Sequence, residues 1–124
     1  MILGTGIDII EVDRVAKAAV KEGFMTRVFT TEERTRFTEC NDDPAHIAGA
    51  FAAKEAVAKA LGTGIGAVEW KDMEILHYPG GQPYARLTGN AEKRMEELGG
   101  ERLHISISHI KQIAVAQAIL EGKC

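Results

Sequence analysis

The sequence predicts one α+β domain in which an antiparallel sheet packs against a single long helix. The helix is indicated by the segment from Pro44 to Leu61, which is rich in alanine, the residue with the highest helix propensity. The sheet is indicated by isoleucine-rich or alternating segments near both ends of the chain, at 2–10 and 103–120. A chain of 124 residues suffices for one hydrophobic core and is too short for two, so residues 1–124 should form a single domain.

The N-terminal half should contain one strand followed by three helices. The isoleucine-rich strand at 2–10 has the composition of a buried strand. A first helix is expected over 11–22, and a second begins where Thr30/Thr31 precedes two glutamates, a typical N-terminal cap. The third is the long helix, with Asp43 as its cap and Pro44 at its first position.

The C-terminal half should be mostly strands. Alternating segments separated by glycine and proline predict a hairpin, and glycines are expected to end the one helix in this half. In order, the expected elements are the strands Met73–His77 and Tyr84–Leu87, the helix Ala91–Leu98, and the strands Leu103–Ser108 and Ile113–Leu120.

Composition excludes several classes of function. The chain is 45% hydrophobic and 27% charged, as soluble globular proteins are, and its net charge of −3 argues against a general nucleic-acid binder. No segment approaches the ~20 apolar residues that span a bilayer, and no signal peptide is recognisable. Cys40 and Cys124 lack metal-ligand spacing, so we expect a reduced, cytoplasmic protein without nucleic-acid or membrane partners.

Asp8 is an unusual residue within an apolar strand. Strand alternation places it on the same face as Gly4, Gly6 and Ile10, where glycines leave room for a ligand or another backbone. A carboxylate in such a position needs a partner, because burying an unpaired charge is costly. The alternative is that Asp8 only caps the next helix or marks the end of the strand.

The long helix carries only three charged residues, which are Lys54, Glu55 and Lys59. Glu55 and Lys59 lie one turn apart and are surrounded by alanines, which favours a chemical role. The alternative is a surface ion pair between positions i and i+4, worth about 0.2–0.5 kcal/mol. A stripe of small residues on the same helix predicts very close packing by another element or subunit, at Gly49, Ala53, Ala56 and Ala60.

A basic stripe on the first helix is formed by Arg14, Lys17 and Lys21. Such stripes are usually solvated faces. Here Phe24 and Met25 follow at once, and the mixture of basic and apolar groups also suits an interface with an acidic helix.

The glycines of 62–66 and His109 can each be explained by structure alone or by a function. The glycines of 62–66 could approach an anion, but they lack Walker spacing and follow a helix, so they are sufficiently explained as a helix end. His109 ends a strand, where it either closes a hairpin or faces a ligand. The Ser108-His109 pair lacks a Gly-x-Ser-x-Gly elbow, so we do not interpret it as a nucleophile and its base.

Four segments together resemble a known family. They are Gly-Ile-Asp-Ile-Ile-Glu at 6–11, the stretch from Phe51 to Gly64, Gly-Gln-Pro at 81–83 and His-Ile-Ser-Ile-Ser-His at 104–109. Their order and spacing resemble those of the holo-acyl-carrier-protein synthases, the short trimeric class of the 4'-phosphopantetheinyl transferases. The resemblance implies a homotrimer, with active sites between neighbours, that transfers phosphopantetheine from coenzyme A to a serine of acyl carrier protein in fatty acid biosynthesis.

The resemblance also implies roles for individual residues. Asp8 and Glu55 match the family's Mg²⁺ ligands, and Lys59 matches the lysine that contacts the phosphates, so Glu55 and Lys59 are the expected catalytic residues. Coenzyme A would be the co-substrate, with Lys59, Gly62, Pro83, Ser108 and His109 in contact with it. The carrier protein would meet Arg14, Lys17, Lys21, Phe24 and Met25.

Two positions depart from the family pattern. Members often have a basic residue where this chain has Ala50, so a phosphate contact is either missing or supplied from elsewhere, by Lys54 or a neighbouring subunit. Gln82 likewise replaces a lysine. Two other functions stay open: a Mg²⁺-dependent diphosphate hydrolase that uses water, and a carrier-protein or nucleotide-binding module without turnover.

Overall fold

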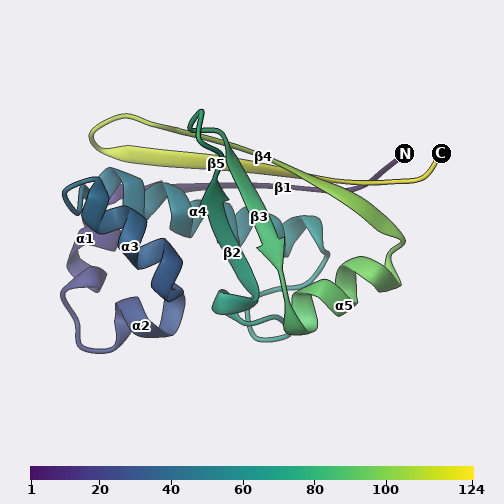
Figure 1. The fold of residues 1–124 in the computed structure, drawn as a ribbon, viewed down its shortest axis with the longest axis horizontal. Coiled ribbons are helices and arrows are strands. Elements are labelled where there is room, and N and C mark those ends of the chain that lie inside the picture. The colour runs from purple at the N-terminus through teal and green to yellow at the C-terminus, as the bar shows by residue number, and fades with distance from the viewer.

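The computed structural model describes residues 1–124 and contains two antiparallel sheets and five α-helices (Figure 1). All of the helices lie on one side of the long strands. The elements are β1 (Ile2–Glu11), α1 (Val12–Ala19), α2 (Phe24–Val28), α3 (Thr31–Glu39), α4 (Pro44–Ala60), a 3₁₀ turn η1 (Trp70–Asp72), β2 (Met73–His77), β3 (Pro83–Leu87), α5 (Gly89–Glu97), β4 (Gly100–His109) and β5 (Ile113–Gly122).

The larger sheet has the strand order β1-β5-β4, so the first and last strands of the chain are paired. In this register Asp8 of β1 lies opposite Ala116 of β5, which in turn lies opposite Ile107 of β4. The smaller sheet is the hairpin β2–β3. The predicted α+β class and the antiparallel pairing are therefore confirmed.

Helix α4 packs across the larger sheet at very short range. A Cβ atom added at Gly4 would lie 2.1 Å from the carbonyl oxygen of Ala60, and one at Gly6 would lie 1.9 Å from that of Ala56. Only glycine allows this approach. Ala56 and Ala60 thus pack against the chain's own first strand, so the close packing predicted for the small residues is made here by another element of the same chain.

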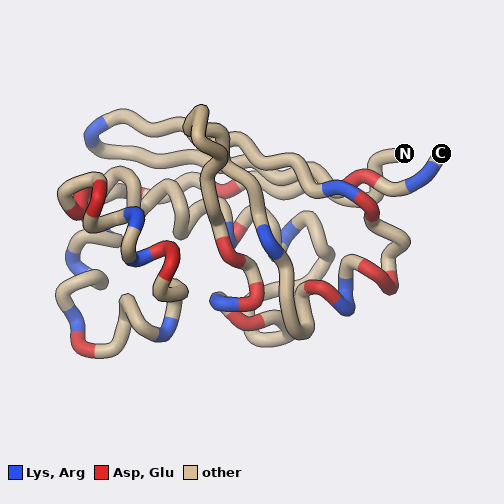
Figure 2. Tube along the Cα trace, in the orientation of Figure 1, with Lys and Arg blue, Asp and Glu red and all other residues tan.

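The other face of the larger sheet has no covering element. Ile7 and Ile9 are 61% and 66% exposed, so the expectation that β1 is a fully buried strand is wrong. The middle of β4 and of β5 carries no charged residue, and the tube in Figure 2 is uncoloured there. The sheet therefore presents one apolar face to α4 and a second, partly apolar face to its surroundings.

Most other boundaries lie within two residues of those predicted, but three larger differences occur. Helix α1 ends at Ala19 instead of residue 22, and residues 24–28, which we did not predict as helical, form the short α2 after Gly23 adopts a left-handed conformation. Strand β4 begins at Gly100 because β5 is long enough to pair with it there. None of the helices is long and apolar enough to cross a membrane.

Candidate active site

Asp8, Glu55 and Lys59 come together where β1 faces α4. The Lys59 ammonium donates a 2.8 Å hydrogen bond to the carbonyl oxygen of Ile7 and lies 3.4 Å from Asp8 Oδ1. Burial raises the pKa of Glu55, the negative charge of Asp8 raises it further, and Lys59 opposes both effects. Glu55 is therefore not simply the partner of Lys59 in a surface pair, because its environment includes a second carboxylate.

The two carboxylates open into a cleft of about 290 Å³. Arg14 and Phe24 also line this cleft, so two of the residues expected to meet a partner protein border the carboxylate pair. Lys17 is exposed on α1, whereas Lys21 lies beyond the end of that helix and is exposed as well. The lining residues are Asp8, Ile9, Ile10, Arg14, Val15, Ala18, Phe24, Phe51 and Glu55.

A second cleft, of about 190 Å³, contains His109 and Pro83. Its other basic side chains are Arg36, His46 and His77, which come from three separate elements and form no motif in the sequence. The rings of His46 and His109 lie 5.4 Å apart. No carboxylate lines this cleft, so its chemistry suits an anionic group.

His77 is held in an unfavourable environment for a charge. Burial, followed by the positive charges of Arg36 and His46, lowers the pKa of His77 to about 4. Its Nδ1 atom is buried and has no hydrogen-bond partner. The ring is therefore neutral at physiological pH.

Helix α4 separates the two clefts within one chain. Phe51 and Glu55 line the first cleft, while Gly49 and Ala50 line the second. Asp8 lies on β1 and His109 on β4, and these two strands flank β5, so the strands are about 10 Å apart. The predicted site residues accordingly fall into two groups that a single chain does not bring together.

The remaining predicted residues have distinct positions. Gly62 has a positive φ of 72° directly after Leu61, the C-cap of α4, as a helix-ending glycine does, and it lines neither of these clefts. Ser108 is exposed and, as the strand neighbour of His109, points to the opposite face of the sheet. Met25 is half-buried on α2.

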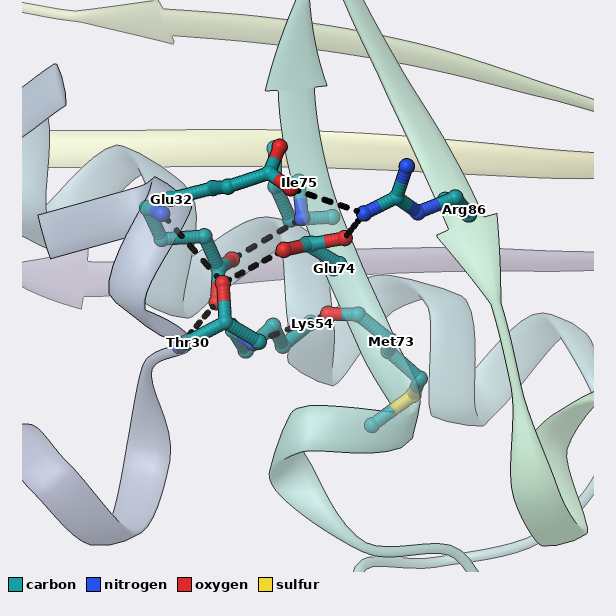
Figure 3. A network of polar contacts seen from close by, with 8 residues as sticks. Thr30, Glu32, Lys54, Met73, Glu74, Ile75 and Arg86 are labelled. Atoms are coloured by element: carbon teal, nitrogen blue, oxygen red, sulfur yellow. Dashed lines mark hydrogen bonds and ion pairs between the residues drawn. The ribbon is translucent and has the colours of Figure 1, made fainter. Parts of the chain in front are cut away.

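Lys54 cannot supply the phosphate contact that Ala50 lacks. Its side chain is 0% exposed and pairs with Glu33 at 2.8 Å, with burial lowering the pKa of the lysine. Figure 3 shows it in the network between α3 and β2, and it lines neither cleft. Arg36, which lines the same cleft as Ala50, is the cation present there instead.

Known proteins match this chain over almost its whole length. A sequence profile of the 4'-phosphopantetheinyl transferase superfamily matches residues 4–117. The holo-[acyl-carrier-protein] synthase of Alkaliphilus oremlandii is 54% identical over 120 residues, covering 96% of this chain and 98% of that protein. That of Alkaliphilus metalliredigens is 52% identical with the same coverage.

Solved structures agree with the sequence matches. The holo-[acyl-carrier-protein] synthase of Neisseria meningitidis superimposes with a TM-score of 0.87 at 35% identity, covering 98% of this chain and 99% of that one. The Bacillus anthracis enzyme, solved in complex with CoA (3',5'-ADP), gives 0.83 at 39% identity over 99% of both chains. The chain therefore belongs to the 4'-phosphopantetheinyl transferase superfamily. Within it, the similarity is to the holo-[acyl-carrier-protein] synthases, as the sequence motifs predicted.

Proposed function

We propose that this chain transfers 4'-phosphopantetheine from coenzyme A to a serine hydroxyl of apo acyl carrier protein, releasing adenosine 3',5'-bisphosphate. The observation that carries the proposal is that Asp8 and Glu55 share an open cleft, with Lys59 beside Asp8, in a chain of this family. The product, the holo carrier protein, would serve fatty acid biosynthesis. We place the reaction in the cytoplasm, where the unpaired Cys40 and Cys124 would stay reduced.

The carboxylate pair fits a magnesium ion. Asp8 and Glu55 supply hard oxygen ligands from facing elements, and their mutual repulsion is what a cation relieves. No third histidine, cysteine, aspartate or glutamate completes a protein cage, which suits Mg²⁺ because this ion keeps several waters. Mg²⁺ bound there would neutralise charge on the diphosphate of coenzyme A.

The residues around the carboxylate pair would bind the phosphates and the carrier protein. The half-exposed side chain of Lys59 has one N–H left, beyond its contacts with Ile7 and Asp8, that would donate to a phosphate oxygen and stabilise the departing bisphosphate. Arg14 and Phe24, which border the same cleft, would hold the carrier protein so that its serine reaches the diphosphate. The full set proposed for the carrier protein is Arg14, Lys17, Lys21, Phe24 and Met25.

The nucleotide end of coenzyme A would lie in the second cleft, against Pro83 and His109. Since α4 separates this cleft from Asp8 within one chain, we propose that neighbouring copies in a homotrimer bring the two halves together. The uncovered sheet face with Ile7 and Ile9 supports association, because large exposed apolar patches mark interfaces. Ser108 lies on that face, and Gly62 ends the helix that carries Glu55 and Lys59.

Mass spectrometry tests the proposed reaction. Apo acyl carrier protein incubated with this chain, coenzyme A and Mg²⁺ should gain about 340 Da, the mass of phosphopantetheine, only when the metal is present. Asp8→Ala and Glu55→Ala should each abolish the gain while circular dichroism shows a folded chain. Cleavage of coenzyme A without carrier protein would indicate the hydrolase instead, and binding without any turnover would indicate a binding module.

A further inference from the structure

Lys54 is a buried residue of α4 whose side chain makes three hydrogen bonds to other elements. Its Nζ atom donates to Glu33 Oε1 at 2.8 Å and to the carbonyl oxygens of Trp70 and Met73 at 2.9 and 2.8 Å. An ammonium has three hydrogens, so every donor of Lys54 is used. Figure 3 shows Lys54 within this network, beside Met73. The side chains of Lys54 and Glu33 are both 0% exposed.

Glu33 is itself fixed from two further directions. Its Oε1 accepts a hydrogen bond from the backbone N–H of Thr30, which closes the capping box of α3. Its Oε2 accepts one from the backbone N–H of Ile75 on β2. Lys54 therefore joins α4 to three other elements, α3, η1 and β2, through bonds with fixed directions.

Apolar burial alone fixes the rotation of α4 weakly. Alanine occupies eight of its 17 positions, and buried residues occur on all sides of the helix. Turning such a helix by one residue, about 100°, would bring other small side chains to most of these contacts, and only Ile47, Phe51 and Val57 are large enough to resist it by packing. The short hydrogen bonds of Lys54 are lost in any other rotation.

Glu55 follows Lys54 directly, so whatever fixes Lys54 also fixes the direction in which Glu55 projects. We propose that Lys54, held by Glu33, is a positioning residue that sets the rotation of α4 and thereby aims Glu55 and Lys59 at Asp8. The inference rests on the proposed function, because it takes Glu55 as a metal ligand. Buried ion pairs are poor sources of net stability, and fixing one register is their best-attested use.

The test is the metal affinity of a variant from which both buried charges are removed. In Lys54→Met/Glu33→Gln the helix keeps its apolar contacts and loses its directional bonds. Binding of Mn²⁺, followed by electron paramagnetic resonance of the free ion without coenzyme A, should weaken at least about tenfold, as is typical when groups that orient metal ligands are removed. The number of sites per folded chain should stay the same, because misdirected ligands lower affinity whereas unfolding lowers the number of sites.

Glu74→Gln is the matched control. Glu74 belongs to the same network and is 6% exposed, but it bonds to Thr30 and Arg86 and makes no hydrogen bond to Lys54 (Figure 3). This variant should have a lower melting temperature and Mn²⁺ affinity within twofold of wild type. Equal weakening of Mn²⁺ binding in both variants would overturn the proposal, because it would show a general effect of destabilisation.

Other outcomes are also decisive. Wild-type Mn²⁺ affinity in Lys54→Met/Glu33→Gln would overturn the inference. If that variant does not fold, Lys54→Gln, whose amide donates only two hydrogen bonds, should show a smaller loss of affinity, and no loss would again overturn it. Mn²⁺ binding without modification of the carrier protein would overturn only the proposed function, while a wild-type chain that binds no Mn²⁺ would overturn both.

Discussion

At the scale of single residues, the fold holds several titratable groups in environments that oppose their charge. His77 is the sharpest case, because its pKa is lowered to about 4 by burial and by the charges of Arg36 and His46. An ordinary histidine has a pKa of 6.5. Between these two pH values the unfolded chain binds a proton at this position that the folded chain does not.

This difference gives a pH dependence of stability. The stabilising contribution of neutral His77 is fully present above pH 6.5 and is lost as the pH falls from 6.5 toward about 4, because protons then favour the unfolded state. His77→Gln should therefore make the melting temperature fall less steeply with acidification over this range, with little change in slope above pH 7. Differential scanning calorimetry across pH 4–8 checks this, and an unchanged acid slope would contradict it.

Lys54 and Glu55 show how adjacent residues divide between structure and chemistry. Lys54 is fully enclosed and hydrogen-bonded on three sides, whereas Glu55 lies at a cleft beside Asp8. The raised pKa of Glu55 means that the folded chain holds a carboxylate where an ionised group is disfavoured. Such a local cost is typical of a functional site.

At the scale of elements, the close approach of β1 and α4 determines the site. The glycines of β1 allow the strand to touch the helix backbone, and the same contact brings Asp8 to Glu55 and Lys59. A strand displaced by even one methyl group would carry Asp8 away from the helix. The geometry of the carboxylate pair therefore depends on residues with no side chain.

Gly6→Ala tests this dependence. The added methyl would lie 1.9 Å from the carbonyl oxygen of Ala56, so the two backbones must separate. We expect a loss of about 3 kcal/mol in the free energy of unfolding, the upper end for overpacking, together with loss of transferase activity. Urea denaturation provides the measurement.

Gly64→Ala is the control for this change. A Cβ at Gly64 would meet nothing within 4 Å, and its φ is not in the left-handed region. This variant should therefore unfold at a urea concentration equal to or above that of wild type. If Gly6→Ala were as stable and as active as Gly64→Ala, the close contact would not be required.

At the scale of the whole molecule, the two halves of the proposed site lie on opposite sides of α4. A chain that acts alone would have to bind coenzyme A around the helix. A trimer in which each cleft with Asp8 faces the neighbour's cleft with His109 would bring them together, because a ring of identical subunits repeats one heterologous contact.

Complementation tests this arrangement. Asp8→Asn and His109→Gln should each be nearly inactive as pure proteins, and their co-refolded mixture should recover activity. In a random 1:1 mixture roughly a quarter of the contacts join two intact halves, so about a quarter of the wild-type rate is expected. A mixture no more active than its components would contradict a site shared between subunits.

Much of this fold was predictable because it depends on local patterns. The caps at Thr30 and Asp43 are both formed as the sequence predicted, since each depends on a side chain and a backbone N–H two or three residues apart. Helix α4 ends at Ala60, just before Gly62 with its positive φ, for an equally local reason. Helix α2 was not predicted, because its five residues are stabilised by aromatic contacts with distant segments, such as that of Phe24 with Phe51.

The sequence by itself determined the fold class, the family and the candidates Asp8, Glu55 and Lys59, because motif order and helix spacing are properties of the chain. Only the tertiary structure decided what each charge faces. It placed Lys54 in a buried network and Glu55 at a cleft, and it gathered Arg36, His46 and His77 beside His109 from separate elements. Long-range contacts determine these surroundings, since the burial of a side chain and the charges around it depend on neighbours tens of residues away in the chain.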